Sequence, residues 1–573
     1  MSIRAAQSAA LSSLQASQSG IAVSSNNIAN ASVDGYTAKS QTLTTNVSSG
    51  ATTGVSVSAT GSTVDTYLLK SINAAASDAG YAEVFTDPLA MVANALGTVG
   101  EDDALTSLIS DLETSITSLA ASPESQSAAA VALADAGDIA NSLNTLSETV
   151  QDQRAQADQT IDETVDQINS LLHQIQSYND QLTGVASGSL GESELTDARN
   201  QAIQNLSELA DVTYFTNSNN QTQIYLGGTL VVGSQVQELE YDATALVTED
   251  TVFGEITVNG TSITDQISGG QLGGLIDLRD DTLPAIQDEL NNLAVTLADS
   301  VNAITNLGTS YPGASELTSA SSLAATDAFS GTGTVRLVAT DNSGTAQEIL
   351  EIDLSTIATV QDLMDEINGS ANMTATLNAD GTLTIASSND DYGISIVNMD
   401  AVVGTDQQGF SDYFGLNDMF SGTSAGTISV NAAWLADPGL MPTGSGSDDA
   451  ALAVGDSVIS SGSADVAEAL AGLFDENIGF DAAGGLGSTT TSLSDYASEI
   501  LSDIARQASD VETKANVATS AFGELVESFS NQYGVNVDEE ALSLSNLESA
   551  YEAAAAILEV TQSMMDTLLE MVR

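Results

Sequence analysis

The sequence predicts an α+β chain of several domains, with long helical coiled-coil termini and stalk and with β-rich inserted outer domains. Three observations predict this class. Apolar residues recur with helical spacing at both ends and in a central block. Alternating segments with Asn and Gly turns lie between these helical regions. The length of 573 residues also exceeds that of one ordinary domain.

An N-terminal helix is expected from Leu14, Ile21 and Ile28, which recur every seven residues. The heptad is weak, because Ser17 and Ser24 stand where a strong coiled coil would carry apolar residues. The turn-forming sequence Asp-Gly-Tyr at 34–36 is expected to end this helical region.

The helical signal is stronger from Leu105 to Leu182. One seam is broken only at Asn179; its apolar members are Ile161, Val165, Ile168, Leu172, Ile175 and Leu182. The tripeptide at 122–124 predicts a connection between antiparallel helices, with Pro123 at the first position of the second helix.

Strands and one long helix are expected in the middle of the chain. Residues 212–265 alternate as strands with turns between them, and residues 284–305 form a helix with Pro284 in its first turn. Residues 334–430 are β-rich, and the alternation on both sides of 378–381 predicts a hairpin. Residues 439–490 are rich in Gly, Ser and Asp and are expected to be loops.

The C-terminal helices have the most regular pattern. After a break at 533–534, a second series runs through Leu544, Leu547, Tyr551, Ala554, Leu558, Thr561, Met565, Leu568 and Val572. A helix with such a stripe has to bury it against a distant segment or another subunit. Periodicity alone leaves these two possibilities equally open.

The charge and the rare residue types exclude several functions. The chain has 78 acidic and 10 basic residues, so its formal net charge is −68. This charge opposes binding to nucleic acid and to anionic membranes. The chain has no Cys and a single His, His173, which is expected on an exposed helix flank. We expect no catalytic, cofactor or metal site, no membrane span and no cleaved Sec-type signal.

The segment 11–36 contains Asn27-Ile28-Ala29-Asn30 and Gly35-Tyr36. It resembles the N-terminal signature of bacterial flagellar rod, hook and hook-associated proteins, although Val33-Asp34 stands where that family usually has Thr-Pro. Four further segments narrow the resemblance to the hook-associated protein 1 family, the first junction proteins between hook and filament: 165–182, 195–214, 269–304 and 534–573.

The resemblance implies a structural, non-enzymatic protein of the flagellum that is exported without signal cleavage and is extracellular. It implies a ring of copies at the hook tip, contacts with the hook protein and with the second junction protein (hook-associated protein 3), and an export chaperone at the C-terminal helix. It leaves two alternatives: a hook or distal-rod protein, and an acidic secreted adhesin or surface-layer protein.

The resemblance also assigns domains and an assembly interface. Residues 1–50 and 535–573 are expected to form a terminal coiled-coil assembly core. Residues 51–307 and 490–534 form a helical stalk domain with a small β-hairpin region, and residues 308–489 form a β-rich outer insert domain. The interface residues implied are Leu14, Ile21, Ile28, Leu544, Leu547, Tyr551, Ala554, Leu558, Met565, Leu568 and Val572.

Overall fold

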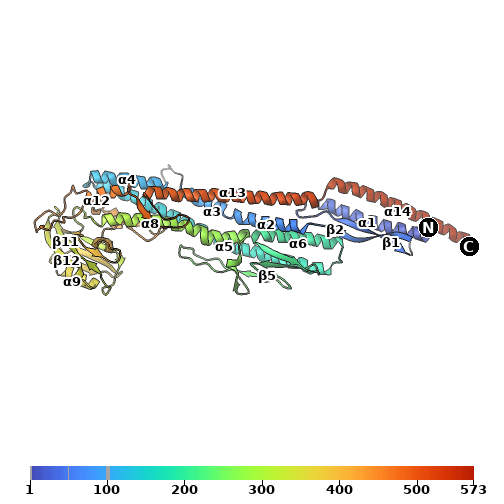
Figure 1. The fold of residues 1–573 in the computed structure, drawn as a ribbon, viewed down its shortest axis with the longest axis horizontal. Helices are drawn as coiled ribbons and strands as arrows, with labels where there is room; N and C mark the ends of the chain where they lie inside the picture. The colour runs from blue at the N-terminus through green and yellow to red at the C-terminus, as the bar shows by residue number, and fades with distance from the viewer. Residues whose placement is uncertain (1–2, 49–50, 98–103, 573) are drawn as a thin grey trace. The chain divides into compact units, whose positions relative to one another are not determined.

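The computed structural model describes residues 3–48, 51–97 and 104–572. Its long helices and small sheets confirm the predicted α+β, multidomain class (Figure 1). The chain divides into two compact units. Unit 1 comprises Met1–Pro88, Arg154–Asp280 and Ser509–Arg573, and unit 2 comprises Leu89–Gln153 and Asp281–Ala508.

Among the described residues, three α-helices contribute to both units: α3 (Thr86–Ala95), α5 (Gln126–Gly184) and α13 (Leu493–Tyr533). The other helices of unit 1 are α1 (Ile3–Ala29), α2 (Thr66–Glu83), α6 (Leu190–Leu209), α7 (Gly270–Asp277) and α14 (Val537–Val572). Its strands are β1 (Ser40–Ser48), β2 (Ala51–Gly61), β3 (Val212–Thr216), β4 (Thr222–Leu226), β5 (Thr229–Val232), β6 (Leu239–Glu240), β7 (Thr257–Val258) and β8 (Thr261–Ser262).

The described residues of unit 1 form three small antiparallel sheets. β1 and β2 form a hairpin, and the strands expected within 212–265 are confirmed in the sheets β3-β4-β5 and β6-β7-β8. Two Asn side chains of α5 hold these sheets. Asn179 donates to the C=O of Thr222 at 2.8 Å and accepts its N–H at 2.9 Å. Asn169 makes the same two bonds with Leu239, at 2.9 and 2.8 Å. The polar break in the predicted seam is therefore where a strand is attached.

Two buried arginines fasten a loop of unit 1. Arg279 Nη1 lies 2.7 Å from Asp158 Oδ1, and its guanidinium carbon lies 4.2 Å from the centre of the Phe253 ring. Arg154 donates to the carbonyl of Thr248 at 3.1 Å. Buried charges need such paired and hydrogen-bonded surroundings. In a chain with few bases, these arginines are committed to holding the fold.

The remaining elements belong to unit 2. Its helices are α4 (Leu105–Ala121), α8 (Leu283–Thr305), α9 (Val360–Asn368), α10 (Phe410–Phe414), α11 (Ala432–Ala436) and α12 (Asp465–Leu473). Its strands are β9 (Glu316–Ser322), β10 (Gly331–Thr332), β11 (Thr334–Asp341), β12 (Ala346–Asp353), β13 (Met373–Leu377), β14 (Thr382–Ser387), β15 (Tyr392–Val397), β16 (Val402–Val403), β17 (Phe420–Ser421), β18 (Ser429–Val430), β19 (Ile478–Phe480) and β20 (Thr489–Thr491).

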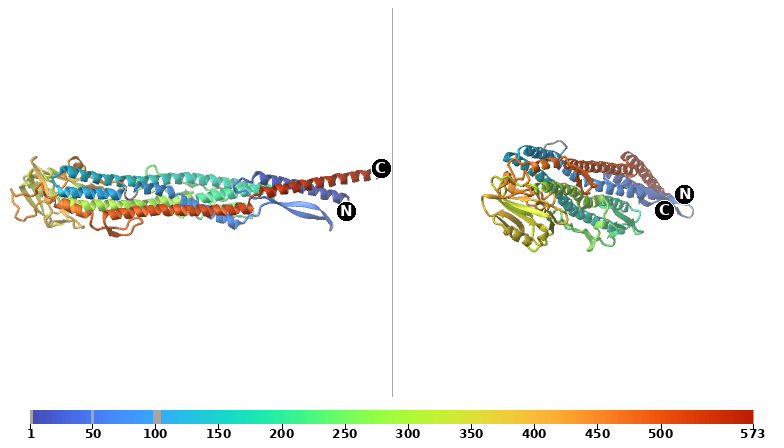
Figure 2. Two further views of the ribbon diagram at one scale, coloured as in Figure 1. Left: turned by 90° about the horizontal axis from the view of Figure 1, so that it is seen from above. Right: turned by 60° about the vertical axis from the view of Figure 1, so that its left-hand side comes forward.

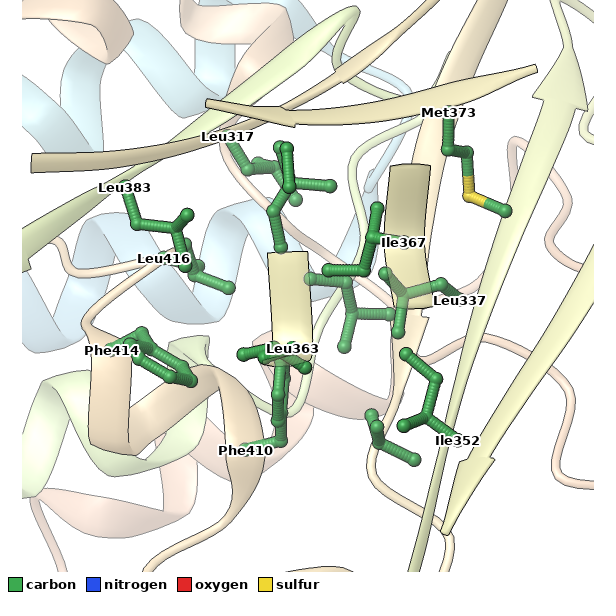
Figure 3. Packing of buried hydrophobic residues seen from close by; sticks show 14 of the residues in the cluster. Leu317, Leu337, Ile352, Leu363, Ile367, Met373, Leu383, Phe410, Phe414 and Leu416 are labelled. Atoms are coloured by element: carbon green, nitrogen blue, oxygen red, sulfur yellow. The ribbon is translucent and has the colours of Figure 1, made fainter. Parts of the chain in front are cut away.

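The β-rich part of unit 2 encloses a large hydrophobic core (Figure 3). Sheets β12-β11-β15 and β13-β14-β9 contribute its strands, and the pairing of β13 with β14 confirms the predicted hairpin. Leu363 and Ile367 of α9 enter this core together with Phe410 and Phe414 of α10. All four side chains are at 0% exposure.

Two expectations in unit 2 were wrong. α5 begins at Gln126 rather than at Pro123, because Ser125 Oγ accepts the N–H of Ala128 at 3.2 Å and starts the helix. Residues 439–490 are not all loop, since they contain α12 and the short strands β19 and β20. α12 packs its buried Leu470 side against α4 and α8, and its nine residues are too few for a visible period.

Candidate assembly surface

The two terminal helices pair within unit 1. α1 and α14 lie side by side and antiparallel, so the marked N- and C-termini lie at one end of the pair (Figures 1 and 2). Gly20 faces Leu547, and Asn27 contacts Glu540. The structure therefore brings the predicted N- and C-terminal stripes to the same place.

The buried face of α1 consists mainly of small residues: Ala10, Ala16, Ser17, Gly20, Val23, Ser24 and Asn27. At Gly20 an added Cβ would lie 2.9 Å from Leu547 Cδ2, so glycine permits the close approach of α14. The predicted interface residues Leu14, Ile21 and Ile28 flank this face and are half-buried. The N-terminal contact thus depends on small residues beside the predicted stripe.

The predicted interface residues of α14 are covered to different degrees. Ala554 is buried; the half-buried ones are Leu544, Leu547, Leu558 and Met565. Tyr551 and Leu568 are exposed, at 37% and 46%, and the side chain of Val572 lies outside the described residues. Thr561 is buried, and its hydroxyl donates to the C=O of Ile557 at 2.9 Å. This polar position is therefore satisfied within its own helix.

A second apolar stripe runs along α14, about a third of a turn from the covered one at roughly 100° per residue. We call it the outer stripe: Ala553, Ile557, Val560, Met564 and Met571. Val560 is 58% exposed, Met564 54% and Met571 78%. The acids after the first turn of α14 share a third sector of the helix: Glu548, Glu552, Glu559, Asp566 and Glu570. α14 therefore has a covered apolar face, an uncovered apolar face and a charged face.

The signature residues form the corner where the chain leaves α1. Asn27, at 0% exposure, donates to the C=O of Lys39 at 2.9 Å and to Glu540 Oε1 at 2.7 Å. Its Oδ1 accepts the N–H of Lys39 at 3.0 Å and the hydroxyl of Tyr36 at 3.0 Å. One amide thus closes the corner and attaches the start of α14 to it.

The other signature residues have smaller structural roles. Gly35 has φ +72°, a conformation that glycine adopts without strain and that other residues rarely adopt. Asn30, directly after α1, donates to the C=O of Asn26 at 2.9 Å. Ile28 is half-buried, and Ala29 is exposed.

A buried ion pair ties this corner to α6. Lys39 Nζ bonds Asp197 Oδ2, and the N–H of Thr37 donates to the same oxygen at 2.9 Å. Burial lowers the pKa of Lys39, while Asp197 acts in the opposite direction. Burial also raises the pKa of Tyr36 to about 12, so its hydroxyl stays protonated and keeps donating to Asn27. These bonds are suited to fixing the angle between α1 and the segment that follows it.

Charge is almost absent from the start of the chain. Residues 1–64 contain Asp34 as their one acidic residue, with Arg4 and Lys39 as the two bases. The whole chain has 78 acids in 573 residues. α1 and the β1–β2 hairpin are therefore a nearly neutral region of a strongly acidic protein.

The described residues contain no group of three or more His, Asp or Glu side chains placed to hold a metal ion. His173 lies exposed on α5, with Nε2 2.6 Å from Glu238 Oε1. Within the same part of the chain, no helix combines the length and apolar character needed to cross a bilayer.

Sequence reasoning missed two features of this surface. The β1–β2 hairpin was not among the expected elements, and its signal would have been a long alternating stretch without charge. The outer stripe was missed because a longer apolar stripe, from Leu544 to Val572, dominates the pattern of the same helix. Its 3–4 spacing from Ala553 to Met564 is visible in the sequence.

Two family models match parts of the chain. The model described as the flagellar hook-associated protein FlgK helical domain matches residues 89–317. The model described as the flagella basal body rod protein matches residues 8–37, which include all six signature residues.

Curated relatives and a solved structure are similar over most of the chain. "Flagellar hook-associated protein 1" of Salmonella typhimurium is 25% identical, and that of Escherichia coli is 26% identical, each over 98% of both chains. The flagellar hook junction protein FlgK of Burkholderia pseudomallei matches 80% of this chain and 98% of its own, with a TM-score of 0.51 and 16% identity. This last likeness concerns the fold.

Proposed function

Since the chain belongs to the family of flagellar hook-associated protein 1, we propose that it is the structural adaptor that joins hook to filament in a bacterial flagellum and assembles through its N- and C-terminal helices. The work is mechanical, and we assign no residue to catalysis. Burial of apolar stripes between subunits supplies the attraction.

The outer stripe of α14 is the observation that carries the assembly role. α1 covers one apolar face of α14 and leaves the other exposed, with Val560 and Met564 more than half accessible. A long helix with two apolar faces is typical of a bundle with more than one partner. The intrachain pair therefore supplies half of a bundle, and neighbouring copies supply the rest.

The predicted domains fit this role. In the proposal, 1–50 and 535–573 form the assembly core, 51–307 and 490–534 form the stalk, and 308–489 form the outer insert. Copies form a ring at the hook tip, between the hook protein and hook-associated protein 3. The chain is exported without signal cleavage to the cell exterior, with a chaperone on the C-terminal helix before assembly.

Two linked experiments test the proposal. Immunogold labelling on flagellated cells should place the protein at the hook–filament boundary. Label along the hook would support a hook or distal-rod protein, and diffuse surface label would support an adhesin or surface-layer protein.

Leu558→Asp should block filament growth, because it puts a charge into the half-buried contact with α1. Leu246→Asp makes the same chemical change at a 77% exposed loop position and should leave growth normal. Fluorescence of Trp434, the single Trp and a buried residue of unit 2, should be unchanged in both variants. Normal filaments in Leu558→Asp would contradict the role of the helix pair.

A further inference from the structure

The β1–β2 hairpin has an outer face that is apolar, exposed and free of charge. Leu43 lies opposite Val57, and both share this face with Val47 by strand alternation. Leu43 is 52% exposed, Val47 64% and Val57 36%. On the other face, Gly54 lies close to α1, since a Cβ there would lie 2.1 Å from Ser12 Oγ, while Thr44 and Asn46 of that face carry exposed polar side chains. No described side chain of the same copy covers the outer face fully.

The absence of charge indicates what covers this face. Residues 40–61 contain no Asp, Glu, Lys or Arg, although the chain carries −68 overall. A basic partner would be drawn to the acidic surfaces instead. A strongly acidic partner needs a contact surface without acidic residues. Two unpaired carboxylates that face each other across an interface would cost roughly several kcal/mol. A second copy of this chain is such a molecule.

The same unit carries a complementary surface. The outer stripe of α14 is also apolar and exposed, and its acids lie on another sector of the helix. Two different exposed surfaces on one chain suit a heterologous, head-to-tail contact, which closes into a ring when the rotation allows it. Pairing of either surface with itself would give an isolated two-fold dimer.

We propose that the outer face of the β1–β2 hairpin (Leu43, Val47 and Val57) docks on the outer stripe of α14 of a neighbouring copy. This inference rests on the proposed assembly role and adds to it the pair of surfaces that meet. It makes the hairpin, and not the terminal helices alone, a determinant of subunit contact.

The absence of Cys from the natural sequence permits a direct test by disulfide crosslinking. Two full-length chains are produced in one flagellated cell, one with Val47→Cys and one with Met564→Cys. Each carries a different epitope at the loop around Val252, which is 92% exposed. Flagella are isolated and mildly oxidised. A dimer carrying both epitopes is expected, because a disulfide forms only where two Cβ atoms come to about 4 Å.

Two matched controls define specificity. Ser563→Cys lies beside Met564 but points away from the outer stripe, and Thr44→Cys lies on the other face of the hairpin. Each control pair should give several-fold less mixed dimer. Equal yields from Ser563→Cys and Met564→Cys, or no mixed dimer from the main pair, would overturn the docking. Absence of both chains from isolated flagella would instead overturn the proposed function.

A charge substitution gives independent support. Leu43→Asp places a charge on an exposed position, so the free chain should fold normally, but filament-bearing cells should fall several-fold. Thr44→Asp adds the same charge on the opposite face and should have the smaller effect. Equal effects of the two variants would count against a contact through the outer face.

Discussion

The β-rich core of unit 2 and the terminal helix pair of unit 1 bury apolar residues in opposite ways. In the core, helices α9 and α10 and two sheets cover Leu363 and Phe414 completely. In the pair, α14 keeps Ile557, Val560 and Met564 at least half exposed. The first region is complete within one chain. The second has the pattern of a surface that is completed by assembly.

Side-chain size accounts for much of this difference. The core contains Leu, Ile and Phe, whereas α1 offers mainly Ala, Ser and Gly to α14. At about 25 cal/mol per Å² of apolar area, small residues contribute little stabilisation. Long helices without tertiary packing are marginal in water. We therefore expect the core to resist unfolding and the ends to depend on partners.

The largest expected effect is on the closed core. Phe414→Ala should reduce the free energy of unfolding of unit 2 by about 3–5 kcal/mol, the usual cost of a lost buried aromatic side chain. Phe414 is at 0% exposure and its ring centre lies 5.1 Å from that of Phe410. Denaturant titration followed by Trp434 fluorescence measures the change.

The matched control lies in the terminal pair. Tyr551→Ala also removes an aromatic side chain, but from a position that is 37% exposed. Surface changes of this kind stay within about 0.5 kcal/mol. A loss as large as that of Phe414→Ala would break the contrast between the two regions.

The next largest effect is a pH dependence in unit 2. Burial raises the pKa of the Glu289 carboxyl from 4.5 to about 7, and Asp503 adds to the rise. Glu289 is at 0% exposure; its Oε1 accepts the N–H of Gly485 at 2.8 Å, and its Oε2 has no partner among the described residues.

Because the folded pKa is raised, the neutral carboxyl is favoured in the folded state. This contribution is fully present below pH 4.5 and is lost as the pH rises through about 7. Its size is roughly 3 kcal/mol at 1.36 kcal/mol per pKa unit. Unit 2 should therefore unfold at lower denaturant concentration at pH 8 than at pH 5.

Glu289→Gln tests the cause, because the amide keeps an oxygen for the N–H of Gly485 but cannot ionise. The variant should lose most of the difference between pH 5 and pH 8. Asp418, whose pKa burial raises to about 6, supplies a smaller residual slope of the same sign. An unchanged slope in Glu289→Gln would assign the pH dependence to other groups.

A smaller effect is expected at the corner after α1. Asn27→Ala should cost about 2 kcal/mol locally, because it leaves the buried N–H and C=O of Lys39 without partners. Faster hydrogen exchange at residues 36–39 and at the start of α14 would report the loss. Asn30→Ala is the control, since the Asn30 amide donates to the C=O of Asn26 and not to Lys39, and it should change exchange at Lys39 little.

Much of the fold could be predicted because long regular elements carry their own signal. The periods of α8, α13 and α14 and the hairpin turn at 378–381 are visible in the sequence. α12 has too few residues to show a period, and α2 lacks large apolar residues at regular spacing.

The candidate site was predictable on one side only. Leu547 and Leu558 belong to a stripe that the sequence shows directly. On α1, Leu547 meets Gly20, and the buried face around it includes Ser17 and Ser24; none of the three carries a hydrophobic signal. A small residue matters for packing only where another helix approaches it closely. Here that helix is α14, more than 500 residues away in the sequence, so the sequence around α1 does not show it. The role of Asn27 is hidden for the same reason.

The smallest effect on the stability of the free chain is expected at the outer stripe. There the contrast between the closed core of unit 2 and the terminal helix pair is greatest. Val560→Asp should change the unfolding free energy of the monomer by no more than about 0.5 kcal/mol, because Val560 is 58% exposed. The same variant should abolish filament growth, since the charge would be buried without a partner in the assembled state. Phe414→Ala should do the reverse and weaken the monomer while leaving the assembly face unchanged. Normal filaments in cells with Val560→Asp would contradict this prediction. They would mean that no neighbouring copy covers the outer stripe and that α1 is the partner α14 needs.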